Sequence, residues 1–150
     1  MPTNAVCLPL TAADLDQVMA IEQRVYPFPW SRGNFEDSLA NNYIACMLRD
    51  TERLIGYFLL MPVLDEVHLL NISVDADLQH AGYGQRLMRE MIDVARARAM
   101  RLILLEVRVS NLRAIDLYRR FGFGVIGRRK NYYPAEDNTR EDAIMMTLTL

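Results

Sequence analysis

Apolar residues recur along the chain with helical and strand periods, and the alternation of the two outlines the fold. Positions spaced three and four residues apart predict four helices, over residues 12–24, 31–39, 84–99 and 111–121. Thr11 with Asp14, Ser31 and Asn111 are suited to cap three of these helices at their N-termini. Gly122 is suited to end the last one, because glycine adopts left-handed backbone at little cost.

Short apolar and β-branched runs predict the strands. They cover residues 43–49, 54–61, 67–74, 102–108, 123–128 and 143–150, and an edge strand is expected around Cys7. The turn at Asp50–Arg53 joins two of these runs as an antiparallel hairpin. The order β α α β β β α β α β β predicts an α/β fold whose mixed, mostly antiparallel central sheet is flanked by helices.

Composition limits the class of protein. A length of 150 residues with 51% hydrophobic side chains suits a single domain over 1–150, and a net charge of −2 argues against direct nucleic-acid or anionic-membrane binding. The N-terminus has no signal-peptide pattern, and the run Tyr57–Leu64 is too short to span a bilayer, so a cytoplasmic protein is expected. Cys7 and Cys46 suggest neither a disulfide framework nor a metal site, and an acyl-cysteine route is the weaker alternative to direct transfer.

A glycine-rich turn, QHAGYG at 79–84, joins a predicted strand to a predicted helix. A helix N-terminus offers unpaired N–H groups and a positive dipole end, and Gly82 and Gly84 would let a phosphate ester approach the backbone. The turn is neither a P-loop, which needs GxxxxGK, nor a dinucleotide fingerprint, which needs a third glycine where Leu87 stands. A turn shaped only for strand–helix packing is the competing interpretation.

The QxxGxG pattern of Gln79, Gly82 and Gly84 resembles the acyl-CoA loop of the GCN5-related N-acetyltransferase (GNAT) superfamily. The stretches IEQRVYPFPWS, VLDEVHLLNISVD, LEVRVSNLRAIDLY, FGF, NYYP and EDAIMM, between Ile21 and Met146, resemble its bacterial ribosomal-protein alanine N-acetyltransferases. This resemblance implies the GNAT fold, acetyl-CoA as cosubstrate without a metal, and the N-terminal alanine of a small-subunit ribosomal protein as acceptor. It also implies cofactor contacts from residues on three segments: Ile72, Ser73, Val74, His80, Ala81, Gly82, Tyr83, Gly84, Gln85 and Asn111.

Two residues carry the chemistry that the resemblance implies. Glu106 ends an apolar stripe on the 102–108 strand, where partial burial makes a carboxylate a stronger base, and the family places its general base there. A salt bridge from Glu106 to Arg108 or Arg101 is the competing interpretation. The family's proton donor to the departing thiolate falls on Tyr118, which could instead be a core tyrosine.

The loop departs from the family's QRQGLG at His80 and Ala81, so a cation that would contact phosphate is missing unless another, such as Arg86, replaces it. His80 is expected to be a loop or phosphate contact rather than a base. Asn111 could be only a helix cap or also a cofactor contact.

An α-amine is a more accessible acceptor than lysine, because its pKa is about 8 against about 10.4. The aromatic segment 26–30 and the predicted turn 131–134 are expected to border the peptide groove, with Asp65 and Glu66 attracting a cationic peptide. A GNAT enzyme for lysine or a small amine and a non-catalytic acyl-CoA-binding module remain alternatives. The sequence leaves the oligomeric state open.

Overall fold

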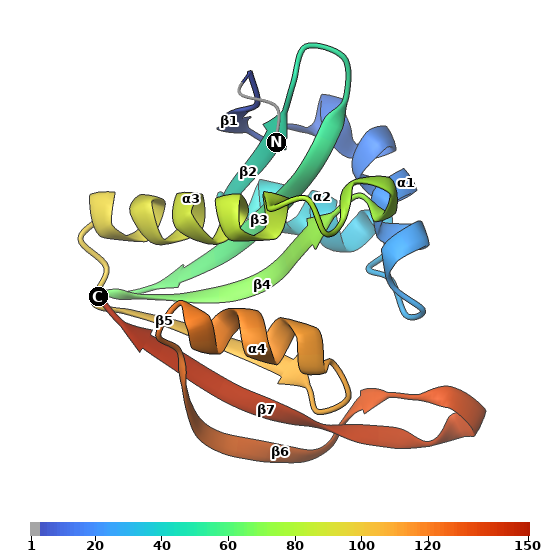
Figure 1. The fold of residues 1–150 in the computed structure, drawn as a ribbon, viewed down its shortest axis with the longest axis vertical. Coiled ribbons are helices and arrows are strands. Elements are labelled where there is room, and N and C mark those ends of the chain that lie inside the picture. The colour runs from blue at the N-terminus through green and yellow to red at the C-terminus, as the bar shows by residue number, and fades with distance from the viewer. Residues whose placement is uncertain (1–3) are drawn as a thin grey trace.

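The computed structural model describes residues 4–150 and contains one seven-stranded sheet (Figure 1). The strands are β1 (Val6–Pro9), β2 (Ile44–Arg49), β3 (Leu54–Val63), β4 (Glu66–Val74), β5 (Leu102–Arg108), β6 (Gly124–Pro134) and β7 (Arg140–Thr149). They lie in the order β1-β2-β3-β4-β5-β7-β6, with β4 and β5 parallel and the other neighbours antiparallel. The predicted mixed, mostly antiparallel sheet is confirmed.

Helices cover both faces of this sheet. They are α1 (Leu15–Val25), α2 (Arg32–Ala40), α3 (Tyr83–Ala97) and α4 (Leu112–Arg120), with 3-10 turns η1 (Ala12–Asp14), η2 (Ala76–Leu78) and η3 (Glu136–Asn138). In Figure 1, α3 and α4 lie in front of the sheet and α2 lies behind it. Apolar side chains of α3 and α4 share one core cluster with the sheet, and those of α1 and α2 share a second. No helix within residues 4–150 is long and apolar enough to cross a membrane.

The predicted helix ends follow from their capping residues. The Ser31 hydroxyl accepts the N–H of Asn34 at 3.2 Å, and the Asn111 side chain accepts that of Ala114 at 3.3 Å. Gly122 has φ +98°, the left-handed conformation that ends α4. These three predictions are confirmed.

The β6–β7 hairpin is longer than predicted, because β6 continues to Pro134 and β7 begins at Arg140. The NYYP segment at 131–134, predicted as a turn, therefore lies in a strand, although the register shifts between Arg129 and Tyr133. The polar residues here pair across the hairpin, where Asp142 accepts from Arg128 at 2.6 Å and from the Asn131 N–H at 2.9 Å. A pattern of hydrophobic residues along one strand does not indicate such cross-strand bonds, so it does not predict these strand ends.

Strands β4 and β5 are neighbours over only part of their length. Their parallel register runs from Glu66 opposite Leu102 to Leu69 opposite Leu105 and then stops. At this point β4 carries a bulge, because Leu60 of β3 faces Leu69 while the preceding Leu59 faces Asn71. Beyond the bulge the two strands diverge (Figure 1), and the candidate site lies where they part.

Gly56 on β3 lets three elements approach one another beside this divergence. A Cβ at Gly56 would lie 2.4 Å from the Ser73 carbonyl oxygen on β4 and 2.9 Å from Leu87 Cδ1 on α3. Glycine is thus required here by space rather than by its dihedral angles.

Candidate active site

The diverging half of β4 exposes backbone groups on its β5 side. The Tyr26 hydroxyl donates to the Ile72 carbonyl at 2.6 Å, and Gln79 Nε2 donates to the Val74 carbonyl at 3.2 Å. Both donors lie outside the β3–β4 ladder, so the backbone of Ile72 and Val74 faces the opening. Ser73 lies between them with its side chain buried, and it donates to Asn71 at 2.9 Å.

The glycine turn leaves the N-terminus of α3 accessible. Gly82 precedes the helix with φ +89°, and no side chain within residues 4–150 caps that end. Tyr83 is buried in the core, so only its backbone can face a ligand, whereas Gln85 is exposed. Gly84 approaches α4, since a Cβ there would lie 3.6 Å from Leu117. The first N–H groups of α3 therefore have no intrahelical acceptor and no side-chain cap.

The cation beside this loop is Arg113, at the start of α4. Its guanidinium contacts both ring nitrogens of His80, with Nη1 lying 3.0 Å from Nε2. His80 and Ala81 are exposed, and His80 has φ +66°. Arg86, the cation suggested by the sequence, instead bonds Glu90 at 2.9 Å and the Ala5 carbonyl at 3.1 Å. Asn111 lies two residues before Arg113, and its side chain accepts a hydrogen bond as the cap of α4.

Glu106 on β5 is a buried carboxylate with an incompletely satisfied oxygen. Its side chain is 7% exposed, and Arg129 Nε lies 3.1 Å from Oε2. Within the described residues, no hydrogen-bond donor is directed at Oε2, so the Arg129 contact is an ion pair without an aligned hydrogen bond. His68 Nε2 lies 3.4 Å from the other oxygen, Oε1.

The arginines considered as partners of Glu106 from the sequence are engaged elsewhere. Arg108 bonds Glu141 at 2.9 Å, and Arg101 lies 3.4 Å from Asp65 and 3.3 Å from Glu66. The competing interpretation predicted a salt bridge from Glu106 to Arg101 or Arg108. An arginine does pair with Glu106, but it is Arg129. Arg101 offsets one of the two negative charges of Asp65 and Glu66, which reduces their attraction for a cationic peptide.

Tyr118 on α4 is influenced by two other tyrosines, Tyr26 at the end of α1 and Tyr133 on β6. Burial raises the pKa of Tyr118 on α4, and the neighbouring Tyr26 and Tyr133 raise it further. Burial likewise raises the pKa of Tyr26 to about 12. All three hydroxyls therefore stay protonated near neutral pH. The Tyr118 ring packs on Phe123 with centroids 5.8 Å apart, so Tyr118 is a core residue, as the competing interpretation predicted.

A chain of hydrogen bonds links α1 to β4 behind this opening. Glu22, 1% exposed, accepts from Tyr57 at 2.7 Å, from Asn71 at 3.1 Å and from the Trp30 N–H at 3.0 Å. The Ser73 hydroxyl donates to Asn71 and lies 3.1 Å from the Tyr26 hydroxyl oxygen. The carboxylate thus connects the aromatic segment 26–30 to the exposed edge of β4.

Aromatic and cationic groups line the side of the opening between α1 and β6. The Arg108 guanidinium lies 4.5 Å from the Tyr133 ring centroid and 5.2 Å from that of Phe28. Phe28 is 40% exposed, whereas Trp30 packs against Phe35 with centroids 5.1 Å apart. Trp30 therefore has a packing role. Phe28 is exposed and Tyr133 is partly exposed, so both rings can be reached from solvent.

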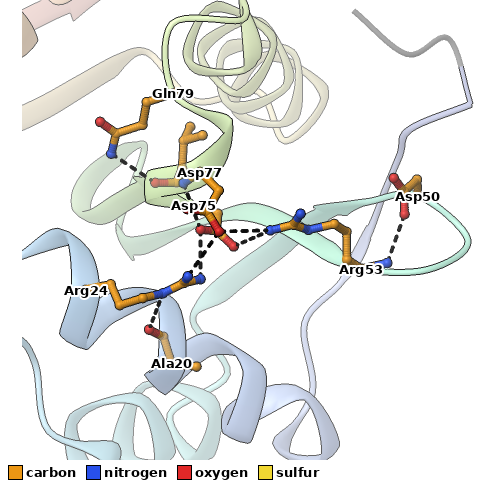
Figure 2. Close-up of polar contacts among 8 residues, drawn as sticks. Ala20, Arg24, Asp50, Arg53, Asp75, Asp77 and Gln79 are labelled. Carbon is orange, nitrogen blue, oxygen red and sulfur yellow. Dashed lines mark hydrogen bonds and ion pairs between the residues drawn. The ribbon is translucent and has the colours of Figure 1, made fainter.

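The end of β4 is held by an ion-pair cluster centred on Asp75 (Figure 2). Arg24 from α1 lies 2.7 Å from one oxygen of this carboxylate, and Arg53 from the β2–β3 turn lies 2.8 Å from the other. Burial disfavours the charged carboxylate, but the Asp77 N–H, Arg53 and Arg24 outweigh it and lower the pKa of Asp75. The cluster fixes β4 immediately before the glycine turn.

The two cysteines have packing roles. Cys7 and Cys46 are half-buried against the core cluster that contains α3. Among residues 4–150, no three histidine, cysteine or acidic side chains gather in a way that could hold a metal ion.

Sequence reasoning did not identify His68, Arg129, Glu22 or Arg113 as site residues. His68 carried a usable signal, because it alternates with buried Val67 and Leu69 and so shares the open face of the sheet with Glu106. Arg129 and Arg113 carried none, since each is one arginine among several on a polar segment.

Comparisons with known proteins identify the family of the chain. The acetyltransferase (GNAT) family model matches residues 15–123. The [ribosomal protein bS18]-alanine N-acetyltransferase of Escherichia coli K12 is 40% identical over 141 residues, covering 94% of this chain and 95% of that protein. The putative counterpart from Bacillus subtilis is 33% identical over 152 residues, covering 100% and 99%.

A solved structure extends the likeness to three dimensions. The crystal structure of the Escherichia coli ribosomal-protein-S18-alanine N-acetyltransferase superposes with a TM-score of 0.91 at 39% identity, covering 97% of this chain and 93% of that one.

Proposed function

The chain belongs to the acetyltransferase (GNAT) family, and on that premise we propose that it transfers an acetyl group from acetyl-CoA to the N-terminal alanine of ribosomal protein bS18. The GNAT family uses acetyl-CoA. The proposal for this chain depends above all on Glu106, whose buried carboxylate keeps an oxygen without a directed donor at the point where β4 and β5 part. The identity with the Escherichia coli enzyme supports the choice of acceptor.

The donor is proposed to lie along the exposed edge of β4 and across the α3 N-terminus. The Ile72 and Val74 carbonyls already accept from Tyr26 and Gln79, so the backbone N–H groups on this edge would pair with the pantetheine arm, and that of Val74 would donate to the thioester oxygen. The N–H groups that follow Gly82 would bind the pyrophosphate, and the left-handed glycine with no side-chain cap suits that role. Asn111, at the start of α4, would contact the cofactor from the segment that follows β5.

The acceptor is proposed to enter over Phe28 and Tyr133 and to present its ammonium group to Glu106. That group would donate to Oε2 and compete with Arg129 for the carboxylate, since both are cations. Glu106 takes one proton, and the neutral amine attacks the thioester carbonyl directly. An α-amine with a pKa of about 8 is roughly one-tenth neutral at pH 7, so a modest base suffices.

Tyr118 is proposed to serve the leaving group. As the carbon–sulfur bond breaks, its hydroxyl gives its proton to the thiolate, and the CoA thiol forms. The second proton, which the attacking nitrogen loses as the amide forms, returns to the Tyr118 oxygen, so the hydroxyl is restored. The raised pKa of Tyr118 keeps its hydroxyl protonated near neutral pH, so a proton is present to donate. Tyr118 also packs in the core, so a variant must keep the ring.

Mass spectrometry of peptides tests the function. A peptide beginning with the alanine terminus of bS18 should be acetylated with acetyl-CoA, and an acetyl-capped peptide whose sole amine is a lysine should react far more slowly. Glu106→Gln should lower kcat/KM by about 10²–10⁴, Tyr118→Phe should lower kcat, and Glu136→Gln, on the exposed η3 turn, should change neither.

The same assay separates the alternatives. Faster transfer to the capped lysine peptide would replace this proposal with a lysine acetyltransferase. Binding of acetyl-CoA without transfer to any amine would replace it with a binding module. A ribosomal acceptor also implies that the protein works in the cytoplasm, which fractionation of cells would test.

A further inference from the structure

His68 is a second titratable group against Glu106, and it comes from a different strand. Its Nε2 lies 3.4 Å from Glu106 Oε1. His68 is in register with Leu104 across the parallel β4–β5 pair, so its side chain shares a sheet face with Leu104 and Glu106. The strand pairing itself therefore places an imidazole beside the proposed base.

Exposure increases from the carboxylate to the imidazole. The Glu106 side chain is 7% exposed and that of His68 is 23% exposed. A base that collects one proton in each catalytic cycle must release that proton before the next cycle. Glu106 has little direct access to water, whereas His68 has more.

The charges around His68 keep it able to accept a proton. Glu106 faces it from β5, Arg129 approaches the same carboxylate from β6, and Glu66, two residues earlier on the same face of β4, is paired with Arg101. Burial lowers the pKa of His68, Glu106 partly offsets this effect, and Arg129 adds to the lowering. The imidazole is therefore neutral near pH 7, with one nitrogen free to accept.

We propose that His68 carries to solvent the proton that Glu106 removes from the acceptor amine. An ammonium N–H bond breaks as an O–H bond forms at Glu106 Oε2, and rotation of the neutral carboxyl group brings this O–H to the side of His68. The O–H bond then breaks as an N–H bond forms at His68 Nε2. The imidazolium releases its Nδ1 proton to water, and Glu106 is again a carboxylate. Exchange of the ring proton with water then returns His68 to the tautomer whose Nε2 can accept. This inference rests on the proposed function, and His68 acts in it as a positioning residue for the proton, through Glu106.

Two substitutions separate proton transfer from packing. His68→Gln keeps a polar group near Nε2 but cannot carry a proton, and His68→Ala leaves space. We expect kcat to fall about tenfold or more in both, with KM for acetyl-CoA unchanged. Added imidazole should restore kcat in His68→Ala, in proportion to its neutral fraction, and not in His68→Gln, where the space is filled. Full activity of His68→Gln, or failure of imidazole to restore His68→Ala, would overturn the relay.

An NMR titration provides a readout that does not need activity. The chain has 2 histidines, so a His80→Asn variant assigns the His68 signals. Because Glu106 raises the pKa of His68, Glu106→Gln should shift the His68 titration to lower pH. An unchanged titration would disprove the contact, whatever the acceptor is. A shifted titration in a protein that acetylates no N-terminal peptide would instead reject the proposed function and, with it, the relay.

Discussion

Replacing the buried carboxylate of Glu22 tests whether the hydrogen-bond chain behind the site stabilises the protein. Glu22 has no cationic partner within the described residues and accepts three hydrogen bonds. In Glu22→Gln the amide oxygen can still accept from Tyr57 and Asn71, but the amide nitrogen then faces the Trp30 N–H, a donor against a donor. The variant retains the side-chain volume and loses one of the three hydrogen bonds that Glu22 accepts.

The expected magnitude follows from that loss. A hydrogen bond to a charged group contributes about 1.5–3 kcal/mol, and an unsatisfied buried N–H costs about 1–3 kcal/mol. The neutral amide is less costly to bury than the carboxylate, because an ion loses more hydration free energy, and this offsets part of the destabilisation. We expect Glu22→Gln to lower the free energy of unfolding by about 2 kcal/mol, and Glu22→Leu, which leaves all three donors unpaired, to lower it further.

Urea unfolding followed by circular dichroism measures both changes, with the slope m checked against wild type. Glu36→Gln on α2 is the matched control, because the Glu36 side chain is 59% exposed and lies 4.0 Å from Arg32; its effect should be below about 0.5 kcal/mol. If Glu22→Leu is as stable as wild type, the desolvation of the carboxylate already cancels its three bonds and our reasoning is refuted.

Three further predictions use other parts of the structure. Gly56→Ala should destabilise by about 3 kcal/mol or more, since the new Cβ would lie 2.4 Å from a backbone oxygen, whereas Gly124→Ala, with nothing within 4 Å, should have little effect in the same urea assay. The lowered pKa of Asp75 means that its stabilisation is present above its unfolded pKa of about 3.9 and is lost as the pH falls through the folded value; acid unfolding of Asp75→Asn should lack that part of the pH dependence, and an identical profile would contradict the ion-pair cluster. Arg113→Ala should weaken acetyl-CoA binding about tenfold in calorimetry at low salt, with a smaller gap at high salt, while Arg119→Ala on the same helix should not; equal affinities would exclude Arg113 as the replacement cation.

Local patterns predicted most of the fold because local chemistry determines it. The Ser31 and Asn111 caps, the left-handed Gly122 and the apolar alternation of 102–108 depend on neighbours within a few residues, and the structure agrees with each. The ends of β6 and β7 depend on bonds across a hairpin, such as Asp142 to Asn131, and no pattern within one strand records them.

The surroundings of the proposed base were harder to predict for the same reason. The position of Glu106 followed from its own strand, but Arg129 and His68 reach it from β6 and β4, strands distant in sequence. The choice of Arg129 over Arg101 or Arg108 depends on strand order and register. A single sequence contains many arginines and does not give that order.

The short parallel contact between β4 and β5 joins two parts of the sheet, β1–β4 and β5–β7, along four residue pairs. Leu69 and Leu105 are the last residue pair of that contact, so β4 and β5 diverge directly after the point where these two side chains lie. Substitutions at Leu69 and Leu105 should therefore change the separation of β4 and β5 beyond the bulge without altering Glu106 or the glycine turn.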